Sequence, residues 1–108
     1  AAASTLLAHG MDVIDAGPAA TPTLGFAVRD QQAVAGVQIT ASHNPPSYNG
    51  IKLFHAAGRV LPGAEGERVL QAYRNHQQRW VSTENLGQLH AAADIHQAHL
   101  DAVLKTVD

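Results

Sequence analysis

Hydrophobic and polar residues alternate along two short segments near the middle of the chain. In the first, from Ala35 to Ala41, Val37 and Ile39 alternate with the polar residues Gln38 and Thr40. Successive side chains of a β-strand point to opposite faces of a sheet, so this alternation predicts a strand. A second alternating run predicts another strand, with Ile51, Leu53 and His55 on one face and Lys52 and Phe54 on the other.

Turn-forming residues fill the segment between these two strands, Ser42-His43-Asn44-Pro45-Pro46-Ser47-Tyr48-Asn49-Gly50. The two prolines restrict the backbone, and the Asn-Gly pair favours a reversal of the chain. We therefore predict a strand–loop–strand unit with a rigid loop.

Helical patterns occur on both sides of this unit. Ala1 to His9 is rich in Ala and Leu, and Gly10 follows where helices commonly end in a left-handed turn. A second helix is predicted through Arg29, with Thr21 as its cap residue and Pro22 in its first turn. A third is predicted from Glu65 to about Gln78, with Val69, Tyr73 and Gln77 on one face. Trp80 follows just beyond this helix.

The remaining segments complete the order of elements. Met11 to Ala16, before Gly17 and Pro18, predicts a short strand, and Val81 to Ala93 is interpreted as a connector. Asp94 is predicted to cap a last helix. Its apolar stripe would contain His96, Leu100, Val103, Leu104 and Val107.

Alternating strands and helices predict an α/β fold, a mixed β-sheet flanked by helices. The chain has 108 residues, 45% of them hydrophobic and 15% charged, which is typical of one globular core.

A net charge of -2 without a basic face argues against nucleic acid as a partner. Cysteine is absent, which excludes disulfides and thiolate metal sites and fits a cytoplasmic protein. The apolar opening, Ala1 to Ala8, is far shorter than the ~20 residues of a membrane span, so no membrane partner is expected.

Ser42 is the candidate with the clearest chemistry. A serine hydroxyl is a poor nucleophile and needs a nearby base together with an electrostatic clamp for the transferring group. Just past a strand end, on a loop stiffened by Pro45 and Pro46, it would be held in place with backbone N–H groups able to face a phosphoryl group. If the two strands pair, the ammonium of Lys52 would lie near the base of the loop.

The segment from Thr40 to Pro45 resembles the phosphoserine loop of the phosphoglucomutase and phosphomannomutase superfamily of α-D-phosphohexomutases. The resemblance continues through Tyr48 to Lys52. Gly10 to Pro22 is similar to the strand and Thr-Pro loop of that family, and Asp94 to Asp108 to the helix between its first and second domains. The resemblance implies the first domain of a phosphohexomutase, which is an isomerase acting as an intramolecular phosphotransferase.

Several roles follow from the resemblance alone. Ser42 would carry the phosphoryl group that interconverts a hexose 1-phosphate and a hexose 6-phosphate through a bisphosphate. His43 and Lys52 would be acid/base or phosphate-contacting residues, with Thr40 and Asn44 in the phosphate loop. Mg²⁺ would bind a phosphoryl oxygen on Ser42, with aspartates of a second domain as its other ligands, and a glucose 1,6-bisphosphate-type activator is possible.

The chain also departs from the family pattern. It has no aspartate-rich metal loop, no sugar-recognition or phosphate-binding loop of the later domains, and no upstream arginine segment. We therefore expect residues 1–93 to be an N-terminally truncated first domain and 94–108 a helix at the junction with a missing second domain. The remaining domains of the same chain would be its partners, and the 108 residues alone are expected to have no turnover. The hexose, whether glucose, mannose or glucosamine, is not decided by this loop.

Other interpretations of these residues remain. Ser42 and His43 could belong to a Ser-His hydrolase, although on an extended backbone their side chains would point apart and no Gly-x-Ser-x-Gly elbow is present. The chain could instead be a non-catalytic binding or assembly module that uses the last helix. His96 and His99 are spaced to share a metal but lack an evident third ligand, and Asp12 and Asp15 are predicted on opposite faces of a strand. Trp80 and Tyr73 are most simply packing residues.

Overall fold

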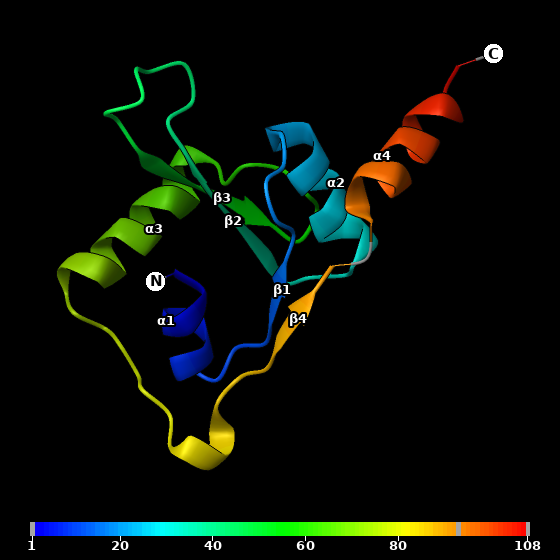
Figure 1. Cartoon of the computed structure of the whole chain (residues 1–108). Helices are drawn as coiled ribbons and strands as arrows, with labels where there is room; N and C mark the ends of the chain where they lie inside the picture. The colour runs from blue at the N-terminus through cyan, green and yellow to red at the C-terminus, as the bar shows by residue number, and fades with distance from the viewer. Residues whose placement is uncertain (1, 93, 108) are drawn as a thin grey trace.

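The computed structural model describes residues 2–92 and 94–107 and confirms an α/β fold (Figure 1). Its strands fall into two ladders, one parallel and one antiparallel, flanked by helices. In chain order the elements are α1 (Ala2–Ala8), β1 (Val13–Asp15), α2 (Thr21–Asp30), β2 (Ala35–Thr40), β3 (Gly50–His55), α3 (Gly63–Arg74), the 3-10 helix η1 (Thr83–Asn85), β4 (Leu89–Ala91) and α4 (Ile95–Leu104).

The predicted strand–loop–strand unit is present as β2 and β3, which pair antiparallel. Their register places Gln38 opposite Lys52 and Thr40 opposite Gly50. Because side chains alternate along a strand, Gln38, Thr40 and Lys52 share one face of this ladder. The loop projects beyond the strand ends at the edge of the molecule (Figure 1).

α2 packs against the face of the β2–β3 hairpin that carries Gln38, Thr40 and Lys52. The buried residues of α2 form much of the small core. Ala27 and Val28 of α2 and Phe54 of β3 are among the buried apolar residues. Glycine allows the close approach: a Cβ on Gly25 would lie 2.5 Å from the carbonyl oxygen of Gly58, in the turn after β3. This packing fixes where α2 begins relative to the loop between β2 and β3.

The segment from 81 to 93 was predicted to be a connector, and that prediction is wrong for its described part. It contains η1 and β4, and β4 pairs in parallel with β1 so that Val13 lies opposite Leu89. Such a strand has only three residues and depends on a partner far away in sequence, which a local pattern does not reveal. Ala93 lies outside the described residues.

α1 and α3 agree with the predicted helices in place but not in all their bounds. α1 is followed by Gly10 in the left-handed region (φ +80°), as predicted, while Ala1 lies outside the described residues. α3 begins two residues before Glu65 and ends at Arg74, because the chain turns at His76 with a φ of +50°. Gln77 is therefore not part of the helical face predicted for it.

α4 begins where expected, since the Asp94 carboxylate accepts a hydrogen bond from the backbone N–H of Gln97 at 3.0 Å. Its predicted stripe is not the face that packs. The buried Ile95 and the half-buried His99 lie against the body, and the stripe residues His96, Leu100, Val103, Leu104 and Val107 are exposed. The end of α4 points away from the rest of the chain (Figure 1). None of the helices described has the length and apolar character that crossing a membrane requires.

Candidate functional site

Ser42 lies two residues beyond the end of β2, exposed and in a left-handed backbone conformation with a φ of +55°. A non-glycine residue with such a φ is uncommon and carries strain. The backbone N–H of Ser42 donates a hydrogen bond of 3.0 Å to the Thr40 hydroxyl, which holds the turn in this conformation. The serine hydroxyl is thus presented on a sharply turned loop rather than along a strand.

Short-range hydrogen bonds order the rest of the loop. The N–H of Asn44 donates to the carbonyl of Ala41 at 3.0 Å, and the N–H of Tyr48 donates to the carbonyl of Pro45 at 2.9 Å. The loop closes where the N–H of Gly50 donates to the Asn49 side chain at 3.0 Å. The segment between β2 and β3 is thus built of turns, as its composition predicted.

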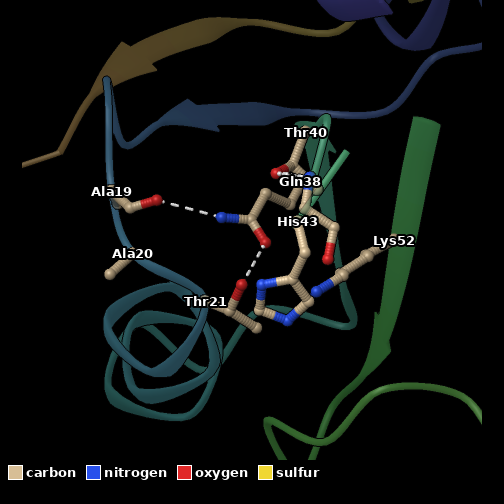
Figure 2. A pocket seen from close by; sticks show the side chains of 8 residues that line it. Ala19, Ala20, Thr21, Gln38, Thr40, His43 and Lys52 are labelled. Carbon is tan, nitrogen blue, oxygen red and sulfur yellow. Dashed lines mark hydrogen bonds between the residues drawn. The ribbon is translucent and has the colours of Figure 1, made fainter. Parts of the chain in front are cut away.

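The candidate site is a pocket of about 410 Å³ between this loop, the hairpin and the start of α2. Figure 2 shows the side chains of His43 and Lys52 extending into the same space beside Thr21. The structure therefore brings together Ser42, His43, Lys52 and Thr40. Lys52 lies near the loop because the two strands pair, as predicted. The complete lining is Ala19, Ala20, Thr21, Gln38, Thr40, Ser42, His43 and Lys52.

Asn44 does not line this larger pocket. It lines a second, smaller hollow of about 190 Å³ under the loop, together with Tyr48 and Asn49. Ser42 and Lys52 line both spaces, so they lie between them.

Sequence reasoning missed Gln38 and the segment that precedes α2. Gln38 is half-buried, and its side chain contacts both Ala19 and Thr21. The available signal was the polar face of β2, where Gln38 and Thr40 alternate with apolar residues. Their partners, 17 and 19 residues away from Gln38 in sequence, could not be found from that pattern.

Thr21 does not cap α2, contrary to the sequence-based prediction. The N-cap is Ala20, which has no side chain able to accept a hydrogen bond, and Thr21 is the first helical residue. Its hydroxyl instead donates to Gln38 at 2.8 Å. The first turn of α2 thus lacks a side-chain cap and faces the pocket with the positive end of the helix dipole. Together with the ammonium of Lys52, this favours an anion in the pocket.

The other candidate groups have structural partners. Asp12 accepts a hydrogen bond from the N–H of Gln88, which links the segment before β1 to the one before β4. Asp15 accepts one from the N–H of Gly17 and so holds the turn after β1. The ring nitrogen Nε2 of His96 lies 3.0 Å from the carbonyl of Pro18, while Nδ1 of His99 lies 2.9 Å from the Thr23 hydroxyl. Within residues 2–92 and 94–107 no three His, Asp or Glu side chains gather into a metal site.

The backbone at Ser42 is not extended, contrary to the expectation that its side chain and that of His43 would point apart in a Ser-His hydrolase. The φ of +55° turns the chain at Ser42, and both residues line the same pocket. The relative direction of these two side chains therefore does not weigh against a hydrolase.

Comparison with known proteins identifies the family of the chain. Residues 1–80 match the family described as "Phosphoglucomutase/phosphomannomutase, alpha/beta/alpha domain I". The chain is 41% identical over 107 residues to a probable phosphoglucosamine mutase of Pyrococcus abyssi, and 44% over 105 residues to one of Thermococcus kodakarensis; each alignment covers 96% of the chain. It is 38% identical over 102 residues, 94% of the chain, to the phosphoglucosamine mutase of Bordetella avium. The chain spans 23% of the length of each of these relatives. It belongs to the phosphoglucomutase/phosphomannomutase family, in which it corresponds to the first domain.

Proposed function

We propose that the full-length protein containing this chain is a phosphohexomutase, and that Ser42 carries the phosphoryl group it transfers. The observation that carries this proposal is the placement of Ser42 on a strained, hydrogen-bonded turn, at a pocket that it shares with His43, Lys52 and the start of α2. Phosphoryl transfer asks mainly for position and for neutralisation of charge, and this pocket provides both.

The reaction we propose has two transfers. In the first, the bond from phosphorus to the Oγ of Ser42 breaks as a bond forms to the free hydroxyl oxygen of a hexose monophosphate. The proton of that hydroxyl ends on Oγ, and a hexose bisphosphate results. After the bisphosphate reorients, its other phosphoryl group bonds to Oγ, and the proton of Oγ returns to the sugar oxygen that is released. One serine therefore interconverts the hexose 1-phosphate and the hexose 6-phosphate.

Roles for the neighbouring residues follow from their positions. His43, in the same pocket, would carry the proton between the sugar oxygen and Oγ, a general acid–base role that histidine side chains commonly fill. Lys52 would contact the phosphoryl group and balance its charge, or reach a sugar hydroxyl and exchange a proton with it. Thr40 would hold the turn through its hydrogen bond to Ser42, and Asn44 would shape the loop from its other side.

Mg²⁺ is proposed as the cofactor, bound to this chain through a phosphoryl oxygen on Ser42. The described residues do not form a metal site by themselves, so its other ligands would have to come from another domain. When bound, the ion would neutralise charge on the phosphoryl group. A glucose 1,6-bisphosphate-type activator, which could phosphorylate Ser42, is part of the same proposal.

The remaining domains of the full-length protein are the proposed partners of this chain. Ile39 and Ile51 pair across the face of the hairpin opposite α2 and are 56% and 66% exposed, an apolar surface suited to contact with other parts of a protein. The proposed domain division assigns residues 1–93 to the first domain and 94–108, which contain α4, to the junction with the next one. On this proposal the 108 residues alone have no turnover, and the full-length enzyme is cytoplasmic.

The names of the relatives favour glucosamine phosphate as the substrate, with glucose and mannose phosphates as the alternatives. Turnover of the full-length protein on the 1-phosphates of all three sugars separates these choices. The hexose with the highest kcat/KM would be assigned as the substrate.

Replacement of the nucleophile tests the proposed function. We predict that Ser42→Ala lowers turnover by roughly 10³-fold or more, because the hydroxyls of Thr21 and Thr40, which also line the pocket, are already hydrogen-bonded to Gln38 and to the N–H of Ser42. Ser47→Ala, a serine of the same loop that does not line the pocket, is the matched control and should leave turnover within about two-fold. Turnover that survives Ser42→Ala would refute the role of Ser42.

A further inference from the structure

Gln38 joins two parts of the proposed site that are far apart in sequence. Its side-chain Oε1 accepts a hydrogen bond of 2.8 Å from the Thr21 hydroxyl, and its Nε2 donates one of 2.9 Å to the carbonyl of Ala19 (Figure 2). Both ends of a single amide are thus used to hold the segment from 19 to 21, which leads into α2 and forms one wall of the pocket.

We propose that Gln38 is a positioning residue for phosphoryl transfer, an inference that rests on the proposed function. It fixes the start of α2 relative to the strand that ends beside Ser42. Gln38 and Thr40 lie two residues apart on one face of β2, so the strand that carries the hydrogen bond to the Ser42 turn also carries the link to α2. The two sides of the pocket are thereby held by neighbouring side chains of one strand.

The chemistry of this link requires a glutamine amide. Thr21 supplies a donor and Ala19 an acceptor, and an amide offers one acceptor and one donor at matching positions. A carboxylate at this position could accept from Thr21 but would repel the Ala19 carbonyl and bring negative charge to a pocket proposed to hold a phosphoryl group. Methionine has a similar length and flexibility but makes neither of these hydrogen bonds.

Loss of the link should affect the transfer step more than binding of the sugar. The segment from 19 to 21 presents the uncapped first turn of α2 to the pocket, and its electrostatic effect depends on its position relative to the transferring group. Displacement of a catalytic element by about 1 Å can cost on the order of 100-fold in rate. We therefore expect a lower kcat with little change in the KM for the hexose phosphate.

The test uses the full-length enzyme with Gln38→Met, Thr21→Val and the double variant. Gln97→Met is the matched control: it is the same substitution and removes a side-chain hydrogen bond, from Gln97 to Asp101 at 2.8 Å, on the exposed side of α4. For Gln38→Met we expect kcat to fall by about 10-fold or more with KM within about two-fold, and for Gln97→Met no change in either. Thr21→Val should also lower kcat, as Gln38→Met does. The double variant should lose little more than Gln38→Met alone, because both substitutions remove the same hydrogen bond.

Two results would overturn the inference. One is a kcat of Gln38→Met and Thr21→Val equal to that of the unchanged enzyme. The other is a fall in melting temperature with kcat preserved, which would make the link structural only. If Gln38→Met does not fold, Thr21→Val decides the question, because it tests the hydrogen bond from the opposite side with a side chain of the same shape. If the Gln38→Met variant has an unchanged kcat while the separate Ser42→Ala variant is inactive, only the role of Gln38 is refuted. An active Ser42→Ala variant would instead refute the proposed function.

Discussion

At Ser42 the backbone adopts a conformation that costs stability at the same position where the proposed chemistry needs a hydroxyl. For an L-residue the left-handed region costs roughly 1–2 kcal/mol, whereas glycine reaches it without steric penalty. The Thr40 hydroxyl offsets part of this cost by accepting the N–H of Ser42. The left-handed turn leaves Ser42 in the lining of the pocket.

This strain predicts a difference in stability between two Ser42 variants that are both inactive. The free energy of unfolding of Ser42→Gly should exceed that of Ser42→Ala by about 0.5–1 kcal/mol, with a higher unfolding temperature. Glycine relieves the strain of the folded state, and the greater flexibility of its unfolded chain offsets part of this gain. Both variants lack Oγ, so neither should turn over. Thermal unfolding of the two full-length variants measures the difference, and an alanine variant at least as stable as the glycine variant would show that the turn is not strained.

The residues of the site could be predicted from the sequence to different degrees. Ser42 and His43 stand in one contiguous motif, and Lys52 reaches the pocket because the two flanking strands pair as their alternation indicates. The contact of Gln38 with Thr21 could not be predicted, since it depends on how α2 packs on the hairpin. For the same reason Thr21 was assigned as a cap although its hydroxyl points to Gln38.

At the level of the elements, helices and strands with several residues of clear pattern were predictable, and their packing was not. β4 is a strand because β1 lies beside it, and its three residues carry no alternation long enough to detect. On α4 the spacing of apolar residues indicated one stripe, but α2 covers the side that carries Ile95 and His99. The position of a neighbour, rather than the pattern within a segment, decided both cases.

Two helical glycines give a test of this packing. Helix propensity alone predicts that alanine stabilises either position, by up to about 1 kcal/mol. At Gly66 of α3 an added Cβ meets nothing within 4 Å, so Gly66→Ala should be neutral or stabilising. At Gly25 the added Cβ would lie 2.5 Å from the backbone oxygen of Gly58, so Gly25→Ala should destabilise by about 1–3 kcal/mol. Denaturant unfolding of both variants measures the contrast, and a stabilising Gly25→Ala would mean that α2 does not approach the hairpin this closely.

For the molecule as a whole, the shape agrees with a part of a larger protein. The radius of gyration of 15.3 Å exceeds the roughly 13 Å expected for a compact domain of about this size. Its relatives are about four times as long as the part that the chain matches, with 23% of each covered. The pocket beside Ser42 supplies a hydroxyl, a histidine, a lysine and the start of a helix, while recognition of the sugar and the other ligands of a metal would come from other domains.

The mass of the Ser42-containing peptide from the full-length protein tests the central claim most directly. We predict a phosphoryl adduct on Ser42, either in the protein as isolated or after incubation with a hexose bisphosphate. Addition of the substrate hexose monophosphate should remove the adduct as a hexose bisphosphate forms. An enzyme that turns over while its Ser42 peptide never carries a phosphoryl group would contradict the claim.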